Sequence, residues 1–168
     1  MNEEEEVRFF NFHSEFLEDS GYIHYEISNF AKSESYMSRH NSKYWSHEPY
    51  LGLGPSAHSF SGRERWWNLS SVRRYCEDLE KGNAPIEGSE SLNDEQLRLE
   101  KMSLGFRARK GFEKEVVRHL PGSEDVIAKL LDLDLIRIDH GRIIPSKKGF
   151  LVADSLPLMF FKENNVES

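Results

Sequence analysis

The stretch from Glu3 to Ile27 reads EEEEVRFFNFHSEFLEDSGYIHYEI, and its pattern decides the fold class. Its first part predicts an amphipathic helix that ends near Gly21, because apolar side chains recur at helical spacing and acidic side chains fill the other face. The apolar set is Val7, Phe9, Phe10, Phe12, Phe16 and Leu17. The next residues, Tyr22 to Ile27, are rich in aromatic and β-branched side chains, which predicts a strand.

Helix, glycine and strand in this order form one unit of an α/β fold. A parallel strand normally lies buried among neighbouring strands, and one unit supplies no such neighbours. We therefore expect the chain to be the later part of a larger protein, with the missing strands upstream of Met1.

Residues 28–67 follow neither the helical nor the strand period. They are dense in polar and aromatic residues, including Tyr36, Tyr44, Trp45, Tyr50, Trp66 and Trp67. Within them, YLGLGPSAHS from Tyr50 to Ser59 predicts an apolar strand that runs into a glycine-bearing turn. Irregular loops at strand ends are where α/β proteins place their sites, so the ligand or the chemistry is expected here.

After Asn68 the pattern becomes helical. Ser70 or Ser71 caps a predicted helix to about Lys81, and Asn93 with Gln96 predicts a capping box for a second helix. That second helix carries Leu99, Met102 and Phe106 and is expected to end by Gly111. Further helices are predicted over 112–120 and 124–133, a β-hairpin with glycine at its turn over 135–144, and a last helix that Ser146 caps and Pro157 kinks or ends. Helices followed by a hairpin wing predict a mostly helical, winged-helix-like domain.

Composition and charge argue against several classes of protein. The 168 residues include 22 basic and 29 acidic side chains, a net charge of -7, which disfavours a nucleic acid as main partner. The acidic start differs from a secretory signal, and no apolar run approaches the roughly 18 residues of a membrane span, so a cytoplasmic location is expected. Cys76 is the single cysteine and cannot build a disulfide or a thiolate cluster; we expect a passive helix residue. No catalytic residue is predicted.

Two groups of residues are candidates for a cofactor or metal site. The Gly52-Leu53-Gly54 sequence fits either a tight turn or a cofactor contact, and it fails the full dinucleotide fingerprint because Ala57 stands at the third glycine position. His40-Asn41 with Tyr44 fits either a metal or haem-iron site or a structural histidine in a loop.

Four blocks in fixed order make the pattern more specific. They are YEISNFA (25–31), SRHN (38–41), Tyr44-Trp45 and YLGLGPSAHS (50–59). In this order they resemble the oxygen-independent coproporphyrinogen III oxidase-like family of radical S-adenosylmethionine proteins. The HNSKY sequence from His40 to Tyr44 looks like the haem-binding signature of that family's haem-chaperone branch. The likeness extends over nearly the whole chain.

The resemblance implies an α+β chain with the last segments of an incomplete TIM-like α/β barrel at 1–67 and a winged-helix-like domain at 68–161. The low complexity of residues 162–168 predicts a disordered tail. It implies a [4Fe-4S] cluster and S-adenosylmethionine in the parent protein, although the C-x-x-x-C-x-x-C cluster motif is absent here. It makes His40 the expected axial ligand of haem iron, with Asn41 and Tyr44 as pocket residues. It places Gly52, Gly54, Ser56, Ala57 and His58 near S-adenosylmethionine.

The expected function is porphyrin or haem handling by the parent, with haem delivery preferred to oxidative decarboxylation of coproporphyrinogen III. Expected partners are the upstream barrel half, haem or porphyrin, and membrane-associated haem acceptor proteins. The chain alone is expected to be inactive. A stand-alone winged-helix nucleic-acid-binding module and a purely structural domain stay open as alternatives. Glu26 and Arg39 lie in matching blocks with no role beyond ion pairing.

Overall fold

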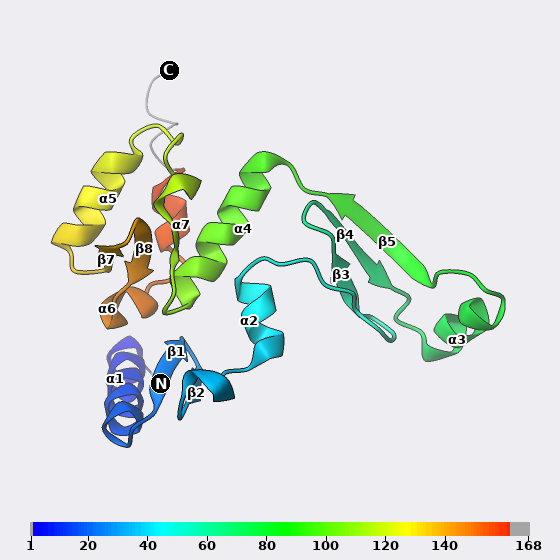
Figure 1. Ribbon diagram of the computed structural model, residues 1–168, viewed down its shortest axis with the longest axis horizontal. Coiled ribbons are helices and arrows are strands. Elements are labelled where there is room, and N and C mark those ends of the chain that lie inside the picture. The colour runs from blue at the N-terminus through cyan, green and yellow to red at the C-terminus, as the bar shows by residue number, and fades with distance from the viewer. Residues whose placement is uncertain (1, 162–168) are drawn as a thin grey trace.

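The computed structural model describes residues 2–161, which form an α+β fold with a broad body and a projecting arm (Figure 1). The tail predicted at 162–168 lies outside these residues. Helix α1 (Glu3–Asp19) starts at a capping box between Asn2 and Glu5, and its C-cap is Ser20, close to the predicted end. No helix within the described part of the chain combines the length and the apolar character needed to cross a bilayer.

Strand β1 (Ile23–Glu26) follows α1, as predicted, but its partner is not a parallel strand. It pairs antiparallel with β2 (Asn29–Ala31), which lies inside the segment predicted to be irregular. All strand pairings among residues 2–161 are antiparallel. The reason is the short connection between β1 and β2, since a tight turn can join antiparallel neighbours whereas parallel strands need a long crossover.

The segment that contains His40 is helical, which corrects the prediction of a loop. A 3-10 helix, η1 (Glu34–Tyr36), precedes α2 (Arg39–Trp45). Ser38 is the N-cap of α2, and its Oγ accepts a hydrogen bond from the Asn41 N–H at 3.2 Å. The Ser38 N–H in turn donates to Tyr25 Oη at 3.2 Å, which ties the start of α2 to β1.

The arm consists of the antiparallel sheet β3-β4-β5 and helix α3 (Figure 1). Its strands are β3 (His58–Phe60), β4 (Glu64–Asn68) and β5 (Ile86–Ser91), and Ser71 caps α3 (Val72–Glu80) as predicted. The expected strand at Tyr50 reduces to an isolated bridge with Phe60. The boundary predicted between 67 and 68 falls inside β4, whose partner β5 lies beyond it.

The C-terminal part of the body starts with α4 (Asp94–Arg107), which has the predicted Asn93/Gln96 capping box. It continues through β6 (Phe112–Glu113), the 3-10 helix η2 (Lys114–Val116), α5 (Ser123–Asp132), β7 (Ile136–Asp139), β8 (Arg142–Pro145), α6 (Lys147–Phe150) and α7 (Leu156–Met159). The strands form a sheet in the order β6-β8-β7, which includes the predicted hairpin.

Two predictions for this part were wrong. The helix predicted over 112–120 is replaced by β6 and η2, because Gly111 has a φ of 58° and turns Phe112 into a strand that pairs with Ile143. The last helix is divided into α6 and α7, and Pro157 lies in the first turn of α7 instead of ending a helix. Proline is well tolerated there, since first-turn N–H groups lack helical partners.

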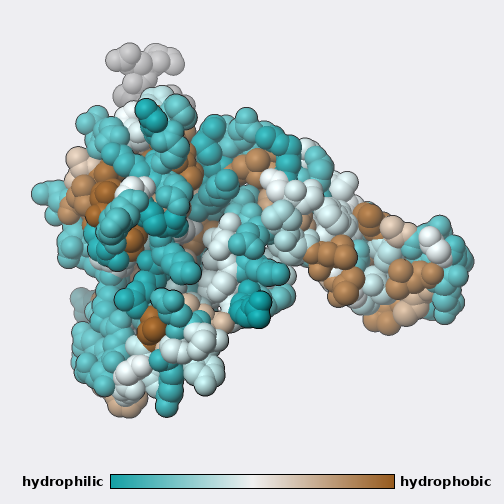
Figure 2. Space-filling view, viewed as in Figure 1, coloured by the Kyte–Doolittle hydropathy of each residue, from teal (hydrophilic) through white to brown (hydrophobic). Residues whose placement is uncertain are grey.

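One hydrophobic core holds the C-terminal elements together. Met102, Phe106, Leu130 and Ile143 are fully buried at its centre. The arm is less well covered: Figure 2 shows apolar side chains at its surface, and Leu51, Leu53, Val72, Leu79 and Ile86 are among the exposed large apolar residues. The body therefore supplies most of the burial that stabilises the fold.

Candidate functional site

The predicted haem residues lie on α2. His40 and Tyr44 are one helical turn apart, and their ring centroids are 4.8 Å apart at an interplanar angle of 71°. Residues four apart share a helix face, so the structure brings these two side chains together. The His40 side chain is exposed and has no hydrogen-bond partner among the described residues. Asn41 lies beside them, half-buried, with its backbone N–H used in the Ser38 cap.

The rings of Tyr44 and Tyr50, 4.3 Å apart, join this helix to the glycine-bearing turn. Tyr50 exchanges both backbone hydrogen bonds with Phe60, at 2.8 and 2.9 Å. Burial raises the pKa of Tyr50, and the neighbouring Tyr44 raises it further. The phenol of Tyr50 is thus held in its neutral form next to Tyr44.

The predicted S-adenosylmethionine residues form one compact turn. A Cβ on Gly52 would lie 2.1 Å from the His58 carbonyl oxygen, so glycine is required there for the chain to approach itself. The Gly52 N–H donates to Ser59 Oγ at 3.0 Å, and the Gly54 N–H donates to Tyr75 Oη at 3.1 Å. Those two donors are therefore occupied by the protein.

The remaining groups of this turn are freer. Gly54 has open space where a Cβ would stand, and Ser56 has a left-handed φ of 57°. The Ala57 N–H closes the turn by donating to the Gly54 carbonyl at 3.3 Å. The His58 ring is exposed and lies 5.9 Å from the Trp67 ring. The turn can offer a ligand the Ser56 hydroxyl, the His58 imidazole and the open side of Gly54.

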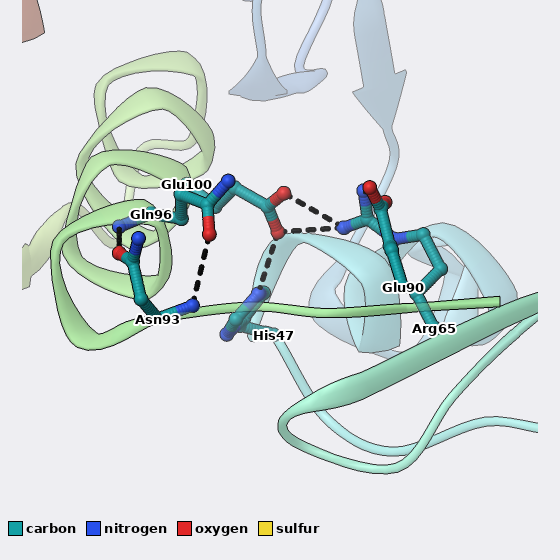
Figure 3. Close-up of polar contacts among 6 residues, drawn as sticks. All are labelled: His47, Arg65, Glu90, Asn93, Gln96 and Glu100. Carbon is teal, nitrogen blue, oxygen red and sulfur yellow. Dashed lines mark hydrogen bonds and ion pairs between the residues drawn. The ribbon is translucent and has the colours of Figure 1, made fainter.

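Sequence reasoning missed an ion-pair cluster where the arm joins the body. Figure 3 shows the Glu100 carboxylate between His47 and Arg65. His47 Nε2 lies 3.0 Å from Glu100 Oε2, and Arg65 Nη2 donates to both Glu100 oxygens at 2.8 and 2.7 Å. Arg65 also pairs with Glu90 at 3.3 Å. Burial alone would raise the pKa of Glu100, but the hydrogen bonds from Arg65 and His47 outweigh it and lower that pKa.

Glu26, for which ion pairing was predicted, is a buried carboxylate with three partners. Its Oε2 accepts from the Ser28 N–H at 2.9 Å and from Asn29 Nδ2 at 2.6 Å, and its Oε1 lies 3.5 Å from Arg107 Nη2. Arg39, in contrast, is exposed at the first position of α2 and has no ion pair among the described residues. Glu26 therefore holds the β1-β2 turn, and its contacts explain it as a structural residue.

Two cavities flank the segment from α2 to His47. The larger, about 690 Å³, lies between β1, α2 and the C-terminal elements, and the smaller, about 260 Å³, is lined by Tyr44, Tyr50, Phe60 and the His47–Glu100–Arg65 cluster. His47 lines both cavities, whereas His40 lines neither. The exposed His40 ring therefore lies on the surface and not at the bottom of either cavity.

A metal–sulfur cluster does not fit the residues of this chain. Cys76 is exposed on α3, and among residues 2–161 no three His, Cys, Asp or Glu side chains are gathered as a metal site. An exposed, unbonded imidazole such as that of His40 does fit the axial position of a haem iron, which needs one or two protein ligands.

Comparison with known proteins gives a consistent result, although no protein-family profile matches the chain. The sequence is 32% identical over 141 residues to the haem chaperone HemW of Mycobacterium tuberculosis H37Rv, which covers 83% of this chain and 35% of that protein. It is 29% identical to HemW of Bacillus subtilis, covering 92% of this chain and 42% of the relative. The mitochondrial radical S-adenosyl methionine domain-containing protein 1 of Bos taurus is 27% identical over 159 residues.

The fold has a solved counterpart in coproporphyrinogen III oxidase (HemN) from Escherichia coli, described as a radical SAM enzyme, with a TM-score of 0.59 and 16% sequence identity. The match covers 86% of this chain and 38% of that one. The chain thus shares its fold with part of a radical SAM enzyme, and its sequence relatives include a protein named for a radical S-adenosyl methionine domain. More narrowly, the chain belongs to the HemN/HemW-like radical SAM family. It spans about 35–42% of the length of the HemW relatives above.

Proposed function

We propose that the whole protein handles haem or porphyrin in a radical SAM scaffold and that this chain holds haem iron through His40. The observation that carries the proposal is the His40–Tyr44 pair on α2, where an unbonded imidazole and a phenol ring share one exposed face. Neutral imidazole is a frequent ligand of haem iron. Asn41 and Tyr44 would border the bound haem.

Haem delivery is the preferred activity, since the sequence relatives named as haem chaperones cover up to 92% of this chain. Oxidative decarboxylation of coproporphyrinogen III is the second candidate, and the fold shared with HemN favours it. In both cases the parent protein would use a [4Fe-4S] cluster and S-adenosylmethionine, whose bound form supplies radical chemistry. The Gly52 to His58 turn is proposed to contact S-adenosylmethionine through Ser56, Ala57, His58 and the open side of Gly54.

Residues 68–161 are proposed to form a winged-helix-like domain that docks on a barrel to which residues 1–67 belong. Nucleic-acid binding is disfavoured on electrostatic grounds. Helix α5 carries Glu124 and Asp125 in its first turn, where a recognition helix would meet phosphate. On the hairpin, Arg137 pairs with Asp139 at 3.3 Å and Arg142 pairs with Glu113, so its positive charges are neutralised.

Haem titration of this chain, followed by Soret absorbance, tests the proposal. His40→Ala is expected to shift the Soret band and weaken binding, whereas His119→Ala, an exposed histidine next to η2, is the matched control. An unchanged spectrum and affinity for His40→Ala would show that His40 is not the axial ligand. The chain is also expected to yield no 5′-deoxyadenosine after cluster reconstitution, and its detection would contradict the assignment of the cluster to another part of the parent.

A further inference from the structure

Helix α1, at the edge of the body (Figure 1), has an aromatic stripe that the rest of the described chain leaves largely exposed. Phe9, Phe12 and Phe16 are 56%, 65% and 60% exposed. Their close ring neighbours belong to the same helix: Phe12 stacks on Phe16 with centroids 6.1 Å apart, and Phe9 lies 3.9 Å from the ring of His13. Single exposed apolar residues are common on proteins, whereas a contiguous aromatic stripe marks an interaction surface.

The opposite side of α1 fixes the helix to the body. Ser14 is fully buried and its Oγ lies 3.1 Å from His24 Nδ1, while the Phe10 ring lies 5.7 Å from the His24 ring. Lys147 of α6 also pairs with Glu18. Helix α1 cannot turn its exposed stripe inward without breaking these contacts, so the stripe faces outward in the folded chain.

The spacing of the stripe is that of a helix–helix seam. Phe9, Phe12 and Phe16 follow at intervals of three and four residues, the pattern by which one helix packs along another. The same pattern extended by one step reaches Glu5 on one side and Asp19 on the other, and both are exposed. The three rings therefore form a short Phe seam that is bordered by a carboxylate at each end.

The acidic border determines which helix fits the Phe seam. Glu15 and Asp19 have no ion pair among the described residues. A second copy of α1 placed antiparallel would bring Glu5 opposite Asp19 of its neighbour, and a parallel copy would bring identical acids together, so like charges would oppose self-association. The complementary partner is a helix with its own apolar seam and with lysine or arginine beyond each end.

We propose that the Phe seam docks a basic-bordered amphipathic helix from the upstream part of the same polypeptide. The chain spans about 35–42% of the length of its HemW relatives, so a parent of that length has the residues to supply such a helix. In a βα barrel the helices form an outer ring around the strands, and residues 1–67 are proposed to belong to such a barrel. The source of the partner therefore rests on the proposed architecture, whereas its chemistry rests on α1 alone.

Two synthetic helical peptides of about 18 residues serve as probes, one of leucine and lysine and one of leucine and glutamate with the same leucine positions. Their binding to the 168-residue chain is followed by fluorescence anisotropy. The Leu/Lys peptide is expected to bind at least about tenfold more tightly than the Leu/Glu peptide. Phe12→Ser with Phe16→Ser should weaken binding of the Leu/Lys peptide at least about tenfold, because two of the three rings are lost. Val72→Ser with Leu79→Ser, which are 65% and 51% exposed on α3, is the matched control and should leave the affinity unchanged.

The acidic border is tested separately from the rings. Glu15→Lys with Asp19→Lys should weaken binding of the Leu/Lys peptide and strengthen binding of the Leu/Glu peptide, a reversal that loss of folding cannot produce. Glu80→Lys with Asp132→Lys, at exposed positions on α3 and α5, changes the net charge equally. At physiological ionic strength, which screens distant charges, this control should alter either affinity by less than about twofold.

The full-length parent tests the source of the partner. Its own upstream helix should cover the Phe seam, so the Leu/Lys peptide should bind the parent at least about tenfold more weakly than it binds the 168-residue chain. Equal binding to both would overturn the assignment to the upstream part and would leave the seam to another protein.

The docking inference itself is overturned if the Leu/Lys peptide does not bind the chain, or if the Phe12/Phe16 variant binds it as tightly as the unchanged chain does. Equal losses in the Phe12/Phe16 variant and in the Val72/Leu79 control would overturn it as well. His40→Ala should bind the peptide as the unchanged chain does, so failure of the haem-iron proposal is seen separately in the Soret titration.

Discussion

His24 is a buried imidazole whose two ring nitrogens both have partners. Nδ1 lies 3.1 Å from Ser14 Oγ, and Nε2 lies 3.0 Å from the Ile27 carbonyl oxygen. Burial lowers the pKa of His24, and the Ile27 carbonyl and the carboxylate of Glu18 only partly oppose it. Lys147, which pairs with Glu18, adds to the lowering. The native state therefore keeps this ring neutral below the pH at which an unfolded histidine takes up a proton.

The free energy of unfolding is thus expected to fall as the pH is lowered from 7.5 to 5. The unfolded chain binds a proton at the ordinary histidine pKa of about 6.5 while native His24 does not, so protonation favours the unfolded state. Urea unfolding at both pH values measures the effect. His24→Gln should reduce the loss, and His119→Gln, an exposed histidine, should not. Equal pH dependence in the chain and in His24→Gln would contradict this explanation.

A second prediction at the scale of residues concerns Glu26. Arg107 pairs with the buried carboxylate of Glu26 and with the exposed carboxylate of Asp154. Glu26→Gln keeps the shape but removes the charge that accepts from the Ser28 N–H and Asn29 Nδ2 and that forms an ion pair with Arg107. It should lower the unfolding free energy by about 1–3 kcal/mol. Asp154→Asn removes the other Arg107 partner, whose side chain is 86% exposed, and should change stability by less than about 0.5 kcal/mol. Urea unfolding distinguishes the two, and equal losses would contradict the assignment.

Site residues could be predicted together when they lie close to one another in the sequence, and were missed when they come from distant segments. His40 and Tyr44, four apart, proved to be neighbours on one helix, and the residues from Gly52 to His58 form one turn. The cluster of His47, Arg65 and Glu100 had no local signal, because its members come from three separate segments and meet only after folding. The positions of predicted haem and S-adenosylmethionine residues are now clear, while their roles stay proposals.

At the scale of elements, the sequence predicted those whose signals are local. Helices α1, α3 and α4 begin at side-chain caps, and α5 has periodic apolar residues. The β7–β8 hairpin has His140 and Gly141 with φ of 46° and 76°, as a tight hairpin turn requires. Strands β3, β4 and β5 were missed. Strand β5, IEGSES, is almost entirely polar or exposed and becomes a strand only through its pairing with β4, a contact that no local period reveals.

Gly111 and Gly141 both have a left-handed φ. Replacing each with alanine tests whether β6 depends on its close packing against β8. A Cβ on Gly111 would lie 1.9 Å from the Ile143 carbonyl oxygen, whereas Gly141 has no atom within 4 Å of that position. Gly141→Ala should cost about 1 kcal/mol from backbone strain alone. Gly111→Ala should cost at least about 3 kcal/mol, because β6 must move away from β8. Thermal unfolding compares them, and similar costs would show that β6 can shift without penalty.

For the molecule as a whole, the orientation of the arm depends on few contacts with the body. Arg65 on β4 and His47 after α2 both bind Glu100 on α4, while Arg63 binds Asp94 at the start of the same helix at 2.5 Å. The Glu100 side chain is 28% exposed and Asp94 is 70% exposed. Electrostatic contacts are worth more when water is partly excluded, so Glu100 is expected to be the principal polar link between arm and body.

Glu100→Gln should therefore loosen the arm without unfolding the C-terminal core, in which Met102 and Phe106 remain fully buried. The expected result is hydrogen exchange about tenfold faster for the amides of β3, β4 and β5, corresponding to a loss of about 1.4 kcal/mol in local stability. Asp94→Asn, which removes the exposed pair between the same two regions, should change these rates by less than about twofold. Exchange measured by mass spectrometry compares the arm peptides with those of α4 and α7. If Glu100→Gln accelerates hydrogen exchange in the arm and in the core equally, Glu100 supports the entire fold and not the arm alone. If neither rate changes, the ion pair does not hold the arm in place. The packing of the Phe60 and His47 rings, which lie 4.5 Å apart, then holds it.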